Sequence, residues 1–385
     1  MKELKVRLEI VTPLFLGGAD PRGEPELRAP SFRGALRFWF RALLGGVLGN
    51  DTKRIFEEES KVFGSTESSS SLTVRVKADD LRKKLFSELA EWDENTRKYR
   101  KSGIAYLFFS AREEKKKREP ERKAFDANQT FWLSISYHSQ LEEAYASLWL
   151  LTHLGGLGSR SRRGGGNLQV VEPAEGINTQ LPGLKINAKT PKELQEELVQ
   201  GLCQLRQWAV KKFHGSLNPY FPGQPEFATL HPNYCRIWIV NENFQDWSEA
   251  LNEFGLKMQN YRNRYDPDYS NVKSVVKGQD KLQPVQRAAF GLPIVFYYPS
   301  LKRSVILEGT RHDRRASPLL VRVIKLANDK CIIVLIQFVN PLLATGEELK
   351  LRQDRKEIAR SSQPDYTLLE KFIEQWPNKL EVKGW

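Results

Sequence analysis

The sequence predicts an α+β protein with two domains. The chain has 385 residues, more than most single hydrophobic cores accommodate, so two domains are expected. Hydrophobic residues make up 40% of the chain and aromatic residues 11%, which is enough to fill packed interiors. Strand-like and helix-like patterns also alternate, and in the first 171 residues they follow the order β-α-β-β-α-β.

The first strand is predicted where residues 4–10 alternate strictly between apolar and charged side chains. Ser31 stands in an N-cap position and predicts a helix over residues 32–48, whose apolar residues follow helical spacing. Residues 51–71 are charged and end in serines, which predicts a loop. Residues 72–77 alternate again and predict the second strand, and residues 79–101 are predicted to form a charged helix.

The first domain is completed by two more strand candidates, a helix and a closing strand. Strands are predicted at 104–109 and 131–137, a helix at 141–154 and a strand at 168–171. Residues 112–123 mix bases and acids without an apolar face, which predicts a mobile hairpin tip or disordered loop. The resulting order of elements is the ferredoxin-like pattern with insertions.

A linker rich in Pro, Gly and Asn at 172–189 separates this half from the next. Thr190 and Glu193 then form a capping-box pattern that starts a helix. Strands are predicted at 227–230, 235–240, 290–296, 319–326 and 331–339, helices at 244–261 and around 369–376, and a basic loop at 262–281. The two halves resemble one another in layout. We therefore expect an N-terminal ferredoxin-like domain at 1–175 and a C-terminal one at 190–385.

The charge balance indicates a polyanionic partner. The chain carries 60 Lys and Arg against 47 Asp and Glu, a formal net charge of +13, and nucleic acid is the commonest polyanion. An unspecific basic surface is the alternative. Cys203, Cys235 and Cys331 are far apart and form no zinc or disulfide pattern, which predicts core residues in a reducing cytosol. With no apolar run of membrane-spanning length and no signal-peptide pattern, a soluble cytoplasmic protein is expected.

Two arginine-rich segments are the candidate binding residues of the first domain. Arg33, Arg37 and Arg41 repeat every four residues along helix 32–48 and drift only ~40° per step, so they form a cationic ridge without an acid. Arg33 opposes the helix dipole and is expected to need a nearby anion.

The segment 155–166, GGLGSRSRRGGG, alternates glycine with arginine and is here called the Gly/Arg loop. Glycine permits positive φ and close approach of a ligand, and arginine offers planar donor forks that suit phosphate. A P-loop would need Lys followed by Ser or Thr, and a dinucleotide loop a third Gly where Ser161 stands. The loop is predicted to bind an RNA backbone through Gly158, Arg160, Arg162 and Arg163; a helix cap with a disordered linker is the alternative.

The position of this loop leads to a more specific expectation. In a β-α-β-β-α-β fold the two helices share one face of the sheet, so the loop should fold over the start of helix 32–48. Its arginines would then lie near Arg33 and Arg37 and form one groove for RNA. The loop is expected to be mobile until RNA binds. A second arginine-dense turn, with Arg311, Arg314 and Arg315, is the other candidate RNA-binding segment.

The motifs together resemble those of the RAMP superfamily of CRISPR proteins, and within it the family of first subunits of the Cmr (type III-B) effector complex. The resemblance rests on TPLFLGG at 12–18, SFRGALRFW at 31–39, the Gly/Arg loop, FGLPI at 290–294 and RASPL at 315–319. It implies two tandem ferredoxin-like (RRM-like) domains and a non-catalytic role in antiviral defence. It also implies that the chain holds the 3′ region of a single-stranded guide RNA and target RNA beside other Cmr and RAMP subunits, which cut.

Two other classes of function stay open from the residues. Some RAMP relatives process guide RNA without metal, using a histidine as general acid–base, and His153 before the Gly/Arg loop is the candidate; it could equally cap its helix. Asp20, Glu24 and Glu26 are the only acids near the first motif that could hold a divalent ion. We expect neither a catalytic residue nor a metal or cofactor. A scaffold that binds acidic protein neighbours through its arginines is the third class.

Overall fold

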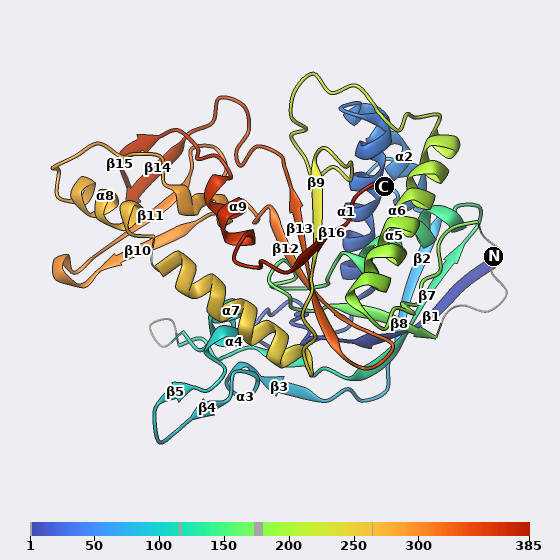
Figure 1. The fold of residues 1–385 in the computed structure, drawn as a ribbon, viewed down its shortest axis with the longest axis horizontal. Helices are drawn as coiled ribbons and strands as arrows, with labels where there is room; N and C mark the ends of the chain where they lie inside the picture. Colours follow the sequence, from blue (N-terminus) through green and yellow to red (C-terminus); the bar gives the residue numbers. More distant parts are fainter. Residues whose placement is uncertain (1, 115–117, 173–179, 264) are drawn as a thin grey trace. The chain divides into compact units, whose positions relative to one another are not determined.

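The computed structural model describes residues 2–114, 118–172, 180–263 and 265–385, and its elements are shown in Figure 1. The described chain forms two compact units. Unit 1 comprises residues 1–256, 320–338 and 378–385, and unit 2 comprises residues 257–319 and 339–377. These two compact units do not coincide with the domains predicted at 1–175 and 190–385. The predicted boundary separates two successive sets of helices and strands along the chain, and it stays a prediction.

The first sheet of unit 1 is antiparallel and has the strand order β2-β7-β1-β8. Its strands are β1 (Lys2–Ile10), β2 (Leu72–Lys77), β7 (Gln129–Tyr137) and β8 (Leu168–Glu172). Along β1 the apolar residues are buried, as the strict alternation of the sequence requires for a sheet with one covered face. The strands predicted at 4–10, 72–77, 131–137 and 168–171 are confirmed.

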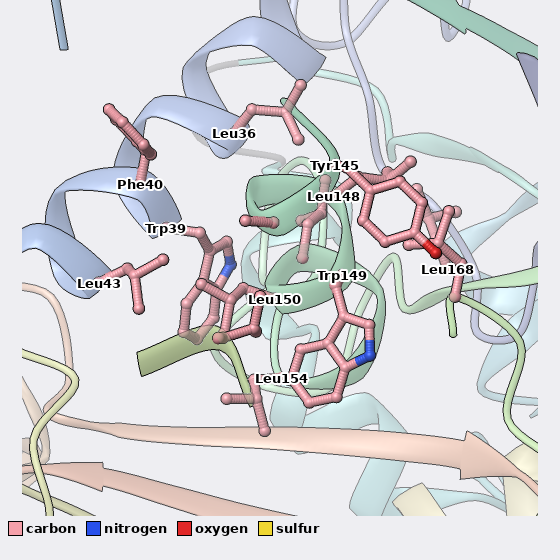
Figure 2. Packing of buried hydrophobic residues seen from close by; sticks show 14 of the residues in the cluster. Leu36, Trp39, Phe40, Leu43, Tyr145, Leu148, Trp149, Leu150, Leu154 and Leu168 are labelled. Atoms are coloured by element: carbon pink, nitrogen blue, oxygen red, sulfur yellow. The ribbon is translucent and has the colours of Figure 1, made fainter. Parts of the chain in front are cut away.

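Two helices, α1 (Ala29–Leu48) and α5 (Leu141–His153), pack in one core with this sheet. Trp39 of α1 lies beside Leu150 of α5 in that core (Figure 2), whereas Phe40 turns to Phe63 and Phe213. Helix α1 begins three residues earlier than predicted and is not capped by Ser31. Its N-cap is Arg28, because Pro30 fixes a helical φ in the first turn and needs no hydrogen-bond donor there.

The second sheet of unit 1 has the order β12-β13-β9-β16. It consists of β9 (Cys235–Val240), β12 (Leu319–Lys325), β13 (Cys331–Phe338) and β16 (Lys379–Glu381). Helix α6 (Pro191–Phe213) starts where predicted, with the Thr190 hydroxyl accepting from the Glu193 N–H at 3.2 Å. Apolar residues of α6 and of both sheets belong to one hydrophobic core, and α7 (Trp247–Asn263) follows β9 in the chain.

Unit 2 contains an antiparallel sheet of order β10-β11-β14-β15. Its strands are β10 (Ile294–Tyr298), β11 (Arg303–Gly309), β14 (Leu349–Gln353) and β15 (Lys356–Ser361). One face is covered by its own core, to which α8 (Asp266–Val276) contributes Val272. The prediction of a basic loop at 262–281 is therefore wrong for residues 266–276, which form α8. Arg264 lies outside the described residues. Helix α9 (Thr367–Ile373) follows β15.

The segment between α1 and β7 differs most from expectation. The loop predicted at 51–71 contains α2 (Thr52–Phe63), which Asp51 caps and which buries Ile55, Val62 and Phe63. Short pieces replace the helix predicted at 79–101: β3 (Lys83–Leu85), α3 (Phe86–Leu89), β4 (Trp92–Asp93) and β5 (Lys98–Tyr99). The strand predicted at 104–109 is α4 (Ser102–Leu107) followed by a 3-10 turn, η1 (Phe109–Ala111), and β6 (Lys123–Phe125) precedes β7.

Three smaller predictions concern residues 227–230, 112–123 and 172–189. Residues 227–230 form no strand, although Leu230 is fully buried. The 3-10 turns η3 (Gln286–Phe290) and η4 (Pro299–Leu301) flank β10. Parts of the predicted hairpin tip, residues 115–117, and of the predicted linker, residues 173–179, lie outside the described residues. Among the helices of the described chain, none is long and apolar enough to cross a membrane.

Candidate nucleic-acid interface

The arginine ridge on α1 is organised by a carboxylate from α2. Arg37 Nε and Arg41 Nη1 both donate to Glu59 Oε1, the latter at 2.9 Å. The Glu59 side chain is only 2% exposed, and a buried charge is tolerated only when it is paired. The ridge itself contains no acid, as predicted, and its counter-ion comes from α2, a segment predicted to be a loop.

Arg33 finds a carbonyl rather than an anion. Its Nη2 donates to the Leu72 carbonyl of β2 at 3.3 Å, so this side chain joins the start of α1 to the first sheet. The side chains of Arg37 and Arg41 are 29% and 44% exposed. The ridge combines a structural contact with exposed cationic surface.

The Gly/Arg loop connects α5 to β8 (Figure 1) and is a folded turn. Leu157 N–H donates to the Gly166 carbonyl at 2.9 Å, which closes the loop on itself. Ser159 N–H donates to the Phe15 carbonyl at 2.8 Å, and Gly166 N–H to the Pro13 carbonyl at 2.9 Å. The alternative of a disordered linker is thus wrong for this backbone, because two of these donors bind the chain that follows β1; mobility of the loop before RNA binds stays a prediction.

Two glycines of the loop are required by backbone conformation and close approach. Gly158 has φ +80°, and a Cβ there would lie 2.5 Å from the Phe15 carbonyl oxygen. Gly166 has φ +63°, and a Cβ there would lie 2.0 Å from the Leu157 carbonyl oxygen. Side chains rarely adopt such φ values, so these glycines build the turn itself. Their conformations serve the fold, whatever else the loop binds.

The base of the loop is fixed by residues that the sequence did not indicate. Arg322, fully buried on β12, donates to the carbonyls of Thr152, Gly155 and Leu168, the last at 2.7 Å. Burial lowers the pKa of Arg322 to about 9. The buried Asn167 side chain accepts from Val323 N–H at 2.8 Å. These contacts tie β8 to β12 and hold the ends of the loop together.

The loop arginines lie across aromatic rings of neighbouring elements. The Arg160 guanidinium is 4.7 Å from the Phe109 ring centre, and its Nε donates to Ser110 Oγ at 2.8 Å. The Arg162 guanidinium is 5.4 Å from the Phe38 ring centre. Arg163 forms a parallel bridge with Val321. Such cation–π contacts hold the guanidinium groups of Arg160 and Arg162 in fixed positions over these rings.

One arginine of the Gly/Arg loop lies against α1, the helix that carries the arginine ridge. Arg162 turns to Phe38 on α1, the residue after Arg37, so the loop does reach this helix. The ridge side chains turn instead to α2 and β2. A single RNA groove shared by loop and ridge stays a prediction.

The second arginine-dense turn lies in unit 2 and surrounds a buried carboxylate. The backbone N–H groups of Arg311 and His312 both donate to Glu347 Oε1 at 2.8 Å, and His312 Nδ1 lies 2.7 Å from Glu347 Oε2. Despite burial, these contacts hold the pKa of Glu347 below its usual value. Arg315 donates to the Pro341 carbonyl at 3.1 Å, and Arg314 is exposed. His312 therefore pairs with an acid of the same unit.

His153, the candidate general acid–base, and Glu24, a candidate metal ligand, are both engaged in contacts within the chain. His153 is fully buried, stacks on Trp149 with ring centres 4.0 Å apart, and contacts the Trp149 carbonyl at 2.9 Å. Burial lowers the pKa of His153 to about 3. Glu24 is paired with Lys83 and Lys123. Among the described residues, no group of three or more His, Cys, Asp or Glu side chains is placed to hold a metal.

The sequence and the fold of this chain are similar to those of known proteins. The model of the RAMP superfamily matches residues 7–169. The Pyrococcus furiosus protein described as CRISPR system Cmr subunit Cmr1-2 is 37% identical over 180 residues, which are 44% of this chain and 96% of that protein. The crystal structure of apo Cmr1 from Pyrococcus furiosus aligns over 100% of both chains with a TM-score of 0.66 at 21% identity. A type III-B Cmr-beta structure bound to cognate target RNA aligns over 98% of this chain and 99% of its own, with a TM-score of 0.52 at 14% identity.

These matches settle the class of protein. The chain belongs to the RAMP superfamily, with an α+β fold of several antiparallel sheets like that of Cmr1. Within the superfamily, it belongs to the Cmr1 family of CRISPR Cmr subunits. The resemblance inferred from the motifs at 12–18, 31–39 and 155–166 is confirmed.

Proposed function

We propose that this chain is a non-catalytic, RNA-binding subunit of a type III-B Cmr effector complex that acts in antiviral defence. It binds single-stranded RNA, holding the 3′ region of the guide RNA and target RNA while neighbouring Cmr and RAMP subunits surround it. The observation that carries the proposal is the Gly/Arg loop, whose Arg160 and Arg162 are partly buried and lie across the rings of Phe109 and Phe38. A structure of similar fold is bound to cognate target RNA, which supports RNA as the ligand.

The strand orders support two tandem ferredoxin-like domains. The first sheet follows the chain as β1-α1-β2-β7-α5-β8, with order β2-β7-β1-β8. The second follows as β9-α7-β12-β13-α9-β16, with order β12-β13-β9-β16. Numbered within each repeat, both orders are 2-3-1-4. We infer two ferredoxin-like repeats whose boundary lies between residues 175 and 190, with the segments of unit 2 as insertions in the second.

Three of the five histidines, His153, His231 and His312, are buried or paired, which supports a binding rather than a cutting role, whereas His138 and His214 are exposed. A general acid–base has to reach the RNA and titrate near neutral pH. His153 is sealed in the core, and burial also lowers the pKa of His231, which is 4% exposed. His312 is engaged by Glu347. The free thiols of Cys203, Cys235 and Cys331 fit a reducing compartment, so we place the protein in the cytoplasm.

Equilibrium binding of the purified chain to a fluorescent, unstructured single-stranded RNA tests this proposal. Affinity should depend little on sequence and fall steeply between about 50 and about 200 mM salt, because several phosphates release counterions on binding. The RNA should remain intact during the measurement. Unlabelled, unrelated RNA should compete, which distinguishes RNA binding from an arginine surface for acidic proteins. An absence of binding at the lower salt concentration, or a clean cut that depends on an accessible histidine, would overturn the proposal.

A further inference from the structure

Arg160 of the Gly/Arg loop and Arg122, which contacts the loop, are held without a carboxylate. Arg122 Nη1 donates to Ser159 Oγ at 3.0 Å, and Arg160 Nε donates to Ser110 Oγ at 2.8 Å. Among the described residues, no Asp or Glu forms an ion pair with either guanidinium. The arginines of the α1 ridge differ, because Arg37 and Arg41 both pair with the carboxylate of Glu59. A serine hydroxyl offsets far less charge than a carboxylate does.

The electrostatic environment of this pair is that of an anion site. Burial, followed by the charge of neighbouring Arg122, lowers the pKa of Arg160. Burial, followed by the charge of Arg22, likewise lowers the pKa of Arg122. Desolvated like charges of this kind are costly unless an anion approaches them. Each guanidinium has five N–H donors in a planar fork, and the serine contact uses one of them.

An exposed aromatic ring lies directly beside these charges. Phe109 is 56% exposed although it is a large apolar residue, and the Arg160 guanidinium covers its ring at 4.7 Å. The η1 turn holds Phe109 and Ser110 next to each other, so the ring and the tether of Arg160 come from one short element. Phe109 and Ser110 line an open groove of about 1570 Å³ in unit 1.

We propose that Phe109, Arg160 and Arg122 form a nucleotide subsite for single-stranded RNA. A base stacks on the face of Phe109 that Arg160 leaves uncovered, and the adjoining phosphate binds at the Arg160 and Arg122 guanidinium groups. Stacking on an aromatic ring with phosphate contact beside it is how proteins hold single strands with little sequence preference. This subsite rests on the proposed RNA-binding function and adds a base contact to it.

The other residues that line the groove limit how much of an RNA strand can bind there. Glu94, Glu113 and Glu114 also line the groove, together with Arg112 and with Arg22, which is paired with Glu119. The carboxylates repel phosphates, which favours contact with one nucleotide over a run of backbone along the groove. The RNA strand must leave the groove on either side of this nucleotide.

The test compares Phe109→Ala with Phe56→Ala in the full chain. Phe56 on α2 is also 56% exposed, which makes it a matched control for the loss of an exposed ring. Affinity for single-stranded RNA should fall roughly 10-fold in Phe109→Ala, the size expected for one stacked base, and should stay unchanged in Phe56→Ala. Phe109→Trp should keep the affinity, because tryptophan also offers a stacking face.

The salt dependence separates the base contact from the phosphate contact. Phe109→Ala should leave the slope of log affinity against log salt unchanged, whereas Arg160→Ala should reduce it by about one. RNA carrying 2-aminopurine should show fluorescence quenching that Phe109→Ala abolishes at saturating protein.

If Phe109→Ala binds RNA like the parent while the parent binds well, the subsite is wrong and the proposed function stands. A parent chain that fails to bind RNA contradicts both. Equal losses in Phe109→Ala and Phe56→Ala would also refute the subsite, because they would show a general effect of removing a surface ring.

Discussion

The guanidinium of Arg322 on β12 donates to the carbonyl of Gly155, the first residue of the Gly/Arg loop. The same side chain also binds the carbonyls of Thr152 and Leu168, which belong to α5 and β8. One buried arginine of the second sheet therefore fixes both ends of the loop that leaves the first sheet.

Replacing Arg322 by methionine should destabilise the protein by about 3 kcal/mol or more, because three buried carbonyls lose their donors. Denaturant unfolding measures this change. Arg75→Met is the matched control, since Arg75 is an exposed strand residue on β2. A loss for Arg322→Met no larger than that of the control would show that the buried contacts contribute little to stability.

Gly166→Ala should disrupt the loop. The new Cβ would lie 2.0 Å from the Leu157 carbonyl oxygen, at a φ of +63° that alanine rarely adopts. We expect at least ~2 kcal/mol of destabilisation in denaturant unfolding, together with weaker RNA binding. Gly223→Ala is the control, because a Cβ there meets nothing within 4 Å. Parent-like stability of Gly166→Ala would mean that the loop tolerates another conformation.

His153 should make stability depend on pH below neutrality. Its pKa is about 3 in the folded protein against an ordinary value of 6.5, so below pH 6.5 the unfolded chain binds a proton that the folded chain does not. Stability contributed by the neutral imidazole is therefore lost as pH falls from about 6.5 towards 3, by up to ~1.4 kcal/mol per pH unit. The difference in unfolding free energy between the parent and His153→Gln should shrink over this range. A difference that is flat with pH would contradict the buried, neutral histidine.

Glu59→Gln should raise RNA affinity several-fold while lowering stability. The substitution frees Arg37 and Arg41 from a buried carboxylate, so more of their charge is available to phosphate. The same change leaves two partly buried cations without their counter-ion, which should cost about 1–3 kcal/mol. Binding titrations and denaturant unfolding measure the two effects. Glu57→Gln, at an exposed position of α2, is the control. Unchanged affinity in Glu59→Gln would mean that RNA does not use this ridge.

Local patterns predicted the strands and helices of the first sheet because each signal lies within a few residues. The alternation at 4–10 and the helical spacing at 36–47 need no distant partner to be recognised. The run 104–109 is apolar without clear periodicity, and such short runs do not distinguish helix from strand. Helix α2 was missed because its apolar residues are sparse among charged ones.

The candidate site was predictable in its residue types and not in its contacts. The Gly/Arg loop and the α1 arginines are visible in the sequence, whereas the carboxylate that pairs with the ridge comes from another helix. Arg322 reads as an ordinary strand residue between two valines, since its partners lie more than 150 residues away. Phe109 gave no signal because exposure of a single aromatic ring depends on tertiary packing.

Photo-crosslinking of 4-thiouridine-labelled single-stranded RNA to the purified chain tests the central claim most directly. Peptides that carry crosslinked nucleotide should come from the Gly/Arg loop at 155–166, from the η1 turn that holds Phe109, and from α1. Their yield should fall with salt and in Arg160→Ala. Crosslinks confined to other parts of the chain, or an absence of crosslinks at low salt, would contradict the account of the Gly/Arg loop as an RNA-binding element.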